Sequence, residues 1–431
     1  FQALEGMTHC SLEGVRPWGG KYIRLKELDK FLPLNNLEFL RIRDCLAVDK
    51  LDLPFMPRLK FLHLSPSLNH HSKPQNQKNE DELQYFENLP NLEELVIDGF
   101  FGNFRDNLTK TSGYFEDKID RWKNIKIDFS SLHELKKLKK IKLSKIKASL
   151  LNRIVALPAA EKLEINSVFY IDKEMNPDDK KEIQKPIEDS DLKFLKKSPN
   201  LRDLSLELGQ CLNREEHFTD FHFCYYKGNG NFIDYVSHRL KKLKLTINFN
   251  EKDQTSLTDV INKICNRFLK LEELIIDFGI ATNDLNFDWA AYRYKQIPRK
   301  QEIDIKKFSK IKDLNSLVIN NGWHFINYKI VNVKDLIKLK QIKNFSCDFE
   351  TIPFNEFRET KKLFQKEKYE NPKYYDEDYS YREEEDKKNW TRFNWINTAE
   401  HYDDWHSLAY EYERLEKKHN KPKKVIRKRK N

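Results

Sequence analysis

The chain has 431 residues, which is enough for two or three ordinary domains or for one elongated array of repeats. Only 12 glycines are present, which weighs against folds that use several glycine-rich phosphate loops. The net charge is +10, but nine Lys and Arg residues and no acids lie between Lys417 and Lys430, so 10 − 9 = +1 remains for the rest. The charge of the body therefore gives no indication of nucleic-acid binding.

One short pattern recurs: an apolar residue, two others, Leu or Ile, one other, and Leu or Ile again. Alternating apolar residues are typical of a half-buried strand, and the earlier apolar residue would pack in the turn that enters it. The pattern predicts ten strands, the last with a weaker match. In chain order they contain Leu37-Leu40-Ile42, Leu59-Leu62-Leu64, Leu92-Leu95-Ile97, Leu138-Ile141-Leu143, Ala160-Leu163-Ile165, Leu201-Leu204-Leu206, Leu240-Leu243-Leu245, Leu271-Leu274-Ile276, Leu314-Leu317-Ile319 and Ile342-Phe345-Cys347.

The segments between these strands include helical spacing, as in Leu132-Leu135-Leu138, which would cover the outer side of the strands. One strand with one helix cannot bury its own apolar face, so neighbouring units must stack. The pattern resembles the leucine-rich-repeat family. This resemblance implies an α/β solenoid with a curved parallel sheet on the concave face and helices and irregular segments on the convex face.

Successive strand centres lie 22 to 46 residues apart, which is more irregular than most leucine-rich repeats. Phrases such as "LPNLEEL" (Leu89 to Leu95) make the units most similar to those of fungal F-box/leucine-rich-repeat proteins. That resemblance implies the substrate receptor of a cullin-RING ubiquitin ligase. No F-box is seen, and residues 1–30 are too short for one. Because the chain begins at Phe1 in mid-pattern, we expect an incomplete N-terminus.

Residues 1–357 are predicted to form the solenoid, with insertions at 65–81, 100–122, 171–190 and 211–238. The last insertion is rich in aromatic rings, which either pack on the solenoid or form a contact site. Beyond it, we predict a charged linker at 358–389, an aromatic cap or partner anchor at 390–416, and a basic tail at 417–431. The tail fits a nuclear signal, a nucleic-acid arm or a solubilising end. Its basic residues are Lys421, Lys423, Lys424, Arg427, Lys428, Arg429 and Lys430.

Catalytic and metal-binding signatures are weak. Asp277-Phe278-Gly279 matches a kinase tripeptide but lies at the end of a predicted strand, without the other kinase motifs. The soft ligand types of the last insertion lack the usual zinc spacing. We therefore expect no enzyme, no metal and no cofactor, while a site hidden in the insertions remains an alternative. Those ligand types are Cys211, His217, His222 and Cys224.

The six cysteines are scattered, which favours a reducing compartment, and no apolar run is long enough to span a membrane. We expect the nucleus or the cytoplasm. The residues that alternate with the apolar strand positions should face the concave side, and their charges change sign along the array. Such a mixed surface suits a protein partner better than a polyanion, with Phe39 and Phe61 as adjacent anchors.

The prediction is thus a non-enzymatic scaffold for protein–protein recognition, with a possible cullin-ligase adaptor as a further partner if an F-box precedes the chain. The alternative is a nuclear scaffold that contacts nucleic acid through its basic tail. The predicted partner-binding residues are Phe39, Arg41, Arg43, Phe61, His63, Glu94, Asp98, Lys140, Lys142, Lys242 and Lys244.

Overall fold

A computed structural model describes most of the predicted solenoid and one short strand beyond it. Among the helices within these ranges, none combines the length and apolarity that a bilayer crossing requires. The described residues are 6–13, 32–46, 53–66, 86–98, 129–144, 146, 151–166, 168, 186–208, 225–250, 257–281, 301–321, 328–348, 356 and 393–396.

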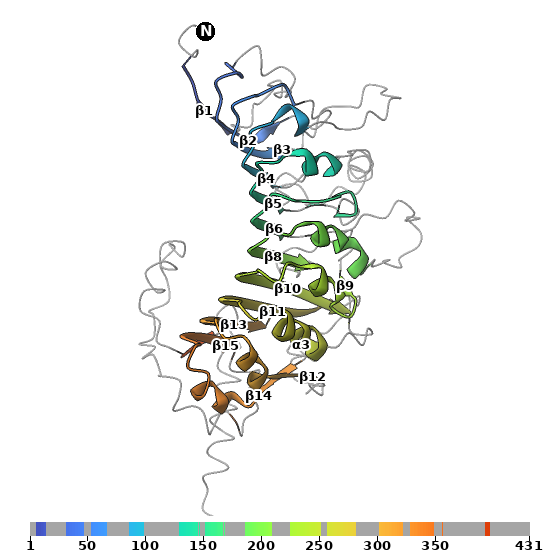
Figure 1. The fold of residues 1–431 in the computed structure, drawn as a ribbon, viewed down its shortest axis with the longest axis vertical. Coiled ribbons are helices and arrows are strands. Elements are labelled where there is room, and N and C mark those ends of the chain that lie inside the picture. The colour runs from blue at the N-terminus through green and yellow to red at the C-terminus, as the bar shows by residue number, and fades with distance from the viewer. Residues whose placement is uncertain are drawn as a thin grey trace, which may run out of the picture.

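The main element is a curved parallel sheet whose strands stack in chain order along the long axis of the molecule (Figure 1). All ten predicted strands are present, and a further strand precedes them. The α/β leucine-rich-repeat solenoid is therefore confirmed. The strands along this path are β1 (His9–Glu13), β2 (Phe39–Leu46), β3 (Phe61–Pro66), β4 (Glu94–Asp98), β5 (Lys140–Ser144), β6 (Lys162–Asn166), β8 (Asp203–Leu208), β10 (Lys242–Asn250), β11 (Glu273–Ala281), β13 (Ser316–Asn321), β15 (Asn344–Asp348) and β16 (Phe393–Ile396).

The apolar residues that alternate along the strands are the buried ones. In β4, Leu95 and Ile97 are buried, whereas Glu94, Val96 and Asp98 are partly exposed. The same alternation recurs in the other units, so the buried side chains form one continuous apolar core along the solenoid. Because each unit buries its apolar face only against its neighbours, the core is long and thin rather than central.

The turn that enters each strand is held by a repeated hydrogen-bond motif. The Glu38 carbonyl accepts from both Lys60 N–H (2.8 Å) and Phe61 N–H (3.0 Å), and equivalent carbonyls do the same up to β15. The Asn91 side chain donates to the Pro57 carbonyl of the preceding unit (2.6 Å), and Asn200 donates to Pro158 in the same way (2.8 Å). This contact gives the Asn of the recurring "PNL" phrase a structural role.

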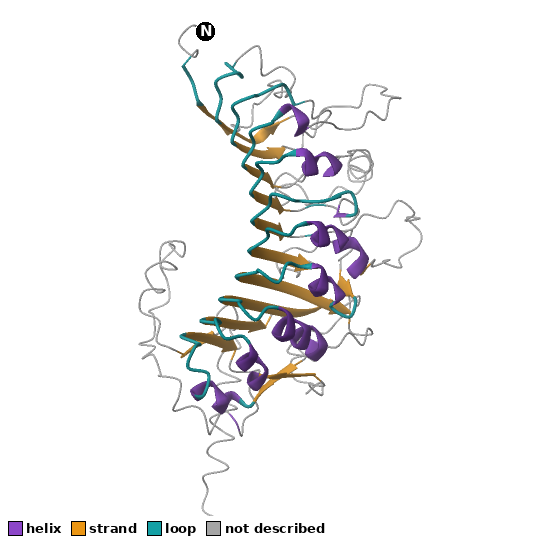
Figure 2. Ribbon diagram, in the orientation of Figure 1, coloured by secondary structure: helices purple, strands orange, loops and turns teal. Residues whose placement is uncertain are grey.

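The convex side carries short helices and short strands (Figure 2). Where the sequence predicted helical cover at Leu132-Leu135, a 3-10 helix forms over Phe129–Glu134. The other 3-10 helices are η3 (Phe86–Asn88), η7 (Asp189–Lys197), η8 (Asn231–Tyr235), η9 (Ile305–Lys310) and η10 (Val333–Ile337). The α-helix of the described part is α3 (Leu257–Arg267), and the convex strands are β7 (Pro186–Glu188), β9 (Tyr225–Lys227), β12 (Gln301–Asp304) and β14 (Tyr328–Val331).

The second half of the aromatic insertion belongs to the solenoid. β9 pairs with β7 and β10, and Tyr226 and Phe232 are buried. The Tyr226 hydroxyl donates to Asp189 (2.7 Å) and accepts from Gly230 N–H (2.7 Å), so these two convex units are joined by a buried polar contact. A Cβ on Gly228 would lie 2.5 Å from this hydroxyl, which leaves room only for glycine. These described rings are therefore core, whereas residues 211–224 lie outside the described ranges.

The predicted C-terminal divisions lie largely outside the described residues. Within 390–416, the strand β16 pairs in parallel with β15, with Phe393 opposite Phe345. The roles of the charged linker, the aromatic segment and the basic tail stay predictions.

Candidate functional site

The parallel register places the predicted partner-binding residues in three rows that run across the strands. The sheet lies on the inner side of the arc, opposite the helices (Figure 1). Phe39, Phe61, Glu94, Lys140 and Lys242 belong to one row, which starts at His9 on β1 and ends at Asn344 on β15. The second row contains Arg41, His63, Lys142 and Lys244, and the third contains Arg43 and Asp98.

Aromatic rings fill the first row at its N-terminal end. The Phe39 and Phe61 rings stack with their centroids 4.3 Å apart and their planes 3° from parallel. The His9 ring stacks on the other face of Phe39 at 5.6 Å. Both Phe side chains remain partly exposed, because successive side chains of a strand point to opposite faces and Leu40 and Leu62 point into the core. We call His9, Phe39 and Phe61 the aromatic ladder.

Two arginines lie beside the aromatic ladder. Arg41 Nη1 is 3.4 Å from Glu13 Oε1, and Arg43 Nη1 is 3.8 Å from the same oxygen. One carboxylate oxygen thus faces two guanidinium groups, each of which is more than a third exposed as a side chain. Neither Nε atom has a hydrogen-bond partner among the described residues. Among the described residues, the arginine pair is therefore only partly neutralised.

His63 stays neutral next to this pair. Burial lowers the pKa of His63, and the Arg41 charge lowers it further, while Asp98 acts in the opposite direction. Its Nε2 atom is buried and has no hydrogen-bond partner within the described ranges. The sequence therefore predicted the position of His63 correctly, but the imidazole adds no positive charge to the face near pH 7.

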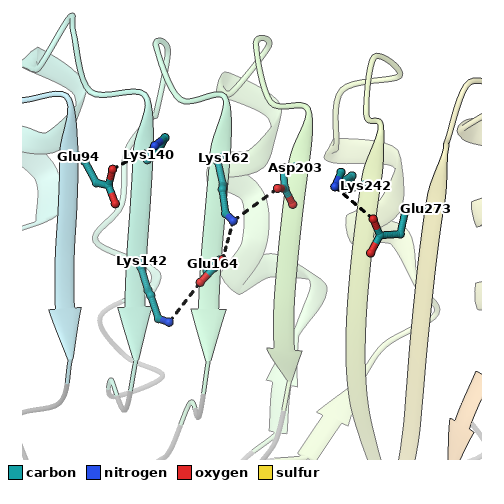
Figure 3. Close-up of polar contacts among 8 residues, drawn as sticks. All are labelled: Glu94, Lys140, Lys142, Lys162, Glu164, Asp203, Lys242 and Glu273. Atoms are coloured by element: carbon teal, nitrogen blue, oxygen red, sulfur yellow. Dashed lines mark hydrogen bonds and ion pairs between the residues drawn. The ribbon is translucent and has the colours of Figure 1, made fainter. Parts of the chain in front are cut away.

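In the middle of the concave face, the charges pair with one another (Figure 3). Lys140 lies 3.2 Å from Glu94, and Lys242 lies 3.2 Å from Glu273 on the next strand. The remaining contacts connect β5, β6 and β8. They are Lys142–Glu164 (3.5 Å), Lys162–Glu164 (2.9 Å) and Lys162–Asp203 (3.6 Å). We call these eight residues the ion-pair ladder.

Within the ion-pair ladder, Glu164 and Lys162 shift each other's pKa. Burial raises the pKa of Glu164, but its hydrogen bonds with Lys162 and Lys142 and their charges more than offset this, so the net pKa is lowered. The hydrogen bond that Lys162 donates to Glu164 raises the pKa of Lys162. The change of sign from strand to strand, predicted from the sequence to complement a partner, thus coincides with pairing inside the sheet.

Asp277, an acid outside the ion-pair ladder, belongs to the third row on a more C-terminal strand. Asp277 is partly buried on β11, next to Thr246, and its Oδ1 has no hydrogen-bond partner in the described part of the chain. Burial raises the pKa of Asp277 to about 6, Lys244 opposes the shift, and Glu207 adds to it. The kinase-like tripeptide is part of β11, as the sequence indicated.

Several predicted residues cannot be placed. The seven basic tail residues and Cys211, His217, His222 and Cys224 lie outside the described ranges. Within those ranges, no group of three or more His, Cys, Asp and Glu side chains could hold a metal ion.

The structure also adds residues that the sequence analysis missed. His9 and Glu13 belong to β1, which was not predicted, although Met7-Cys10-Leu12 has the repeat spacing if Cys is counted as apolar. Glu164, Asp203 and Glu273 alternate with the apolar strand positions but are not among the predicted partner-binding residues. The sequence signal for these three residues was a charge opposite to that at the matching position of a neighbouring unit.

No family model matches the chain, and no curated protein matches it significantly. Among the solved structures that match is the crystal structure of an internalin from Listeria monocytogenes. It is 13% identical, with a TM-score of 0.36, and the alignment covers 81% of this chain and 77% of that chain. Because identity and TM-score are this low, the fold rests on the strand order and register described above.

Proposed function

We propose that the protein is a non-enzymatic scaffold that binds a protein partner on its concave face. The aromatic ladder and the arginine pair form its anchor, and this cluster is the observation that carries the proposal. Aromatic and Arg side chains dominate the binding energy of protein interfaces. Here they are partly exposed on the sheet rather than packed in the core.

The ion-pair ladder has a different role in this proposal. Each of its lysines already has a carboxylate partner within 4 Å. A partner that approached these groups would have to compete with the existing contacts, and exposed ion pairs of this kind contribute little. We therefore assign the middle of the face to solubility and to the rejection of wrong partners.

A finer role rests on sequence resemblance alone. The similarity of the repeat phrases to fungal F-box/leucine-rich-repeat proteins supports a substrate receptor of a cullin-RING ligase, in the nucleus or the cytoplasm. The runner-up is a nuclear scaffold that binds nucleic acid through the basic tail, which the run of nine basic residues supports.

Affinity capture from reduced cell extract, quantified by mass spectrometry, tests the proposal. The bait is the chain expressed from its complete gene. We expect at least one protein to be lost with Phe39→Ala/Arg41→Ala/Phe61→Ala and kept with the matched control Lys140→Ala/Lys242→Ala. Recovery of cullin-ligase adaptors together with that protein would support the receptor role. Recovery of the same proteins with the triple variant and with the control, together with their loss when residues 417–431 are deleted, would favour the runner-up.

A further inference from the structure

The stacking of the aromatic ladder decides which part of each ring a partner can reach. Phe39 and Phe61 lie almost parallel at 4.3 Å, so they cover each other's faces, and His9 covers the second face of Phe39. The edges of the Phe39 ring are what remain for contact. An aromatic ring is electron-poor at its edge, so such edges favour an anion, a carbonyl oxygen or the face of another ring.

The arginine pair has the same electrostatic preference. Both guanidinium groups approach one oxygen of Glu13 at 3.4 and 3.8 Å, distances longer than those of good charge-assisted hydrogen bonds. Among the described contacts, two positive charges therefore share one carboxylate. Asp98, which belongs to the third row, lies near His63. Neither of the two arginines forms an ion pair with Asp98 among the described contacts.

Resting on the proposed function, we propose that the anchor recognises an acidic segment of the partner, in which Asp or Glu lies next but one to an aromatic or large apolar residue. The apolar side chain would contact the edges of Phe39 and Phe61, and the carboxylate would bind Arg41 and Arg43. Two positions along a strand are about 6.6 Å apart, which is the spacing between the row of Phe39 and the row of Arg41.

Single-stranded nucleic acid is a poorer match for the same cluster. Bases bind proteins by stacking on open ring faces, but both faces of Phe39 and one face of Phe61 already stack on rings of this chain. A phosphate backbone that continued along the sheet would also meet Glu94, Asp203 and Glu273. Among the described residues, the two arginines that share one carboxylate lie at the N-terminal end of the face, which suits a short acidic segment.

The test is a selection of phage-displayed random dodecapeptides on the immobilised intact chain. We expect enrichment of peptides with an acid two positions from Phe, Tyr, Trp or Leu. Phe39→Leu/Phe61→Leu, which keeps apolar volume, should weaken the selected peptides by about 10-fold, and Arg41→Glu/Arg43→Glu should select basic peptides instead. Circular dichroism confirms that each variant is folded.

Glu13 gives a sharper test, because in this proposal it competes with the partner. Glu13→Gln should tighten the acidic peptides by about 2- to 5-fold, the range of an exposed ion pair. The matched control is Glu273→Gln, which removes a carboxylate of the ion-pair ladder and should leave the affinity unchanged.

The outcomes separate this inference from the proposed function. Selected peptides of neutral or basic composition that are lost in the Phe39→Leu/Phe61→Leu variant would overturn the acidic segment but keep the concave anchor. Peptides that bind that variant equally well would overturn both. Displacement of acidic peptides by a single-stranded oligonucleotide at equal concentration would overturn the inference in favour of nucleic acid.

Discussion

The N-terminal end and the middle of the concave face have the same backbone but opposite surface chemistry. In β2 and β3 the first row holds stacked rings, whereas from β4 to β11 it holds charges that pair between strands. The buried side is alike in both regions, since Leu62 and Leu163 are both fully buried. The leucine pattern therefore builds the scaffold, while the intervening positions are free to specialise.

The comparison also changes how charge patterns in such arrays are interpreted. A change of sign from one unit to the next indicates pairing across parallel strands as well as complementarity to a partner. The distinguishing feature is the replacement of charged side chains by aromatic ones, which in this row occurs at Phe39 and Phe61.

The largest expected effect concerns the scaffold that the two regions share. Leu62→Ala and Leu163→Ala should each cost about 2–5 kcal/mol of stability, because both remove a fully buried side chain and leave a cavity. Urea denaturation followed by circular dichroism measures the two costs. If only one substitution were costly, the two regions would not share one continuous core.

The next effect separates the two surfaces. Phe39→Ala/Phe61→Ala should weaken a captured partner about 100-fold, as expected for losing two aromatic anchors. Lys140→Ala/Lys242→Ala should change the affinity by less than about 3-fold, because each lysine already forms an ion pair with a neighbouring glutamate. Titration by surface plasmon resonance compares them. Equal losses would contradict the assignment of the anchor.

A smaller effect concerns Asp277, a carboxylate of the same face outside the ion-pair ladder. Its pKa in the folded chain is about 6, against an ordinary value of 3.8, so its ionised form is disfavoured by folding. Its contribution to stability is full below about pH 3.8 and is lost as pH rises through 6. Asp277→Asn should therefore gain about 1–3 kcal/mol over the wild type at pH 7 and lose that advantage at pH 4.

Denaturation curves at the two pH values measure this difference for Asp277→Asn. Glu273→Gln serves as the control, since Glu273 is paired with Lys242 and should show no such gain. A constant difference between wild type and Asp277→Asn across this pH range would contradict the raised pKa.

The smallest effect lies within the ion-pair ladder. A double-mutant cycle on Lys242 and Glu273 should give a coupling of about 0.2–1 kcal/mol, as for other exposed pairs. Salt at 1 M should reduce it, because screening then acts over about 3 Å. A coupling that survived high salt would indicate a hydrogen bond rather than a screened charge pair.

Sequence reasoning predicted the ten central strands because each unit repeats the same alternation. It missed α3, although Leu257, Val260, Ile261 and Ile264 follow helical spacing, because the signal that recurs in every unit lies in the strands. It also missed β7, β9, β12 and β14, which have only three or four residues and depend on neighbouring units for pairing. Such short strands carry little pattern of their own.

For the site, the sequence placed Phe39 and Phe61 side by side, and their stacking confirms that placement. The identity of the ion pairs could not be predicted in the same way. Glu164 contacts Lys162 on its own strand and Lys142 on the previous one, a choice that depends on side-chain reach and burial. Our proposal replaces partner binding by Lys140, Lys142 and Lys242, which the sequence predicted, with a role in solubility and the rejection of wrong partners.

The most direct measurement is an alanine scan of the first row, from His9 to Asn344, for binding to the captured partner. Because we assign partner binding to the N-terminal end, we expect the loss of affinity to concentrate at Phe39 and Phe61 and to fall to near zero at Lys140, Lys162 and Lys242. Losses that are spread evenly along the row, or that are largest at the lysines, would contradict it.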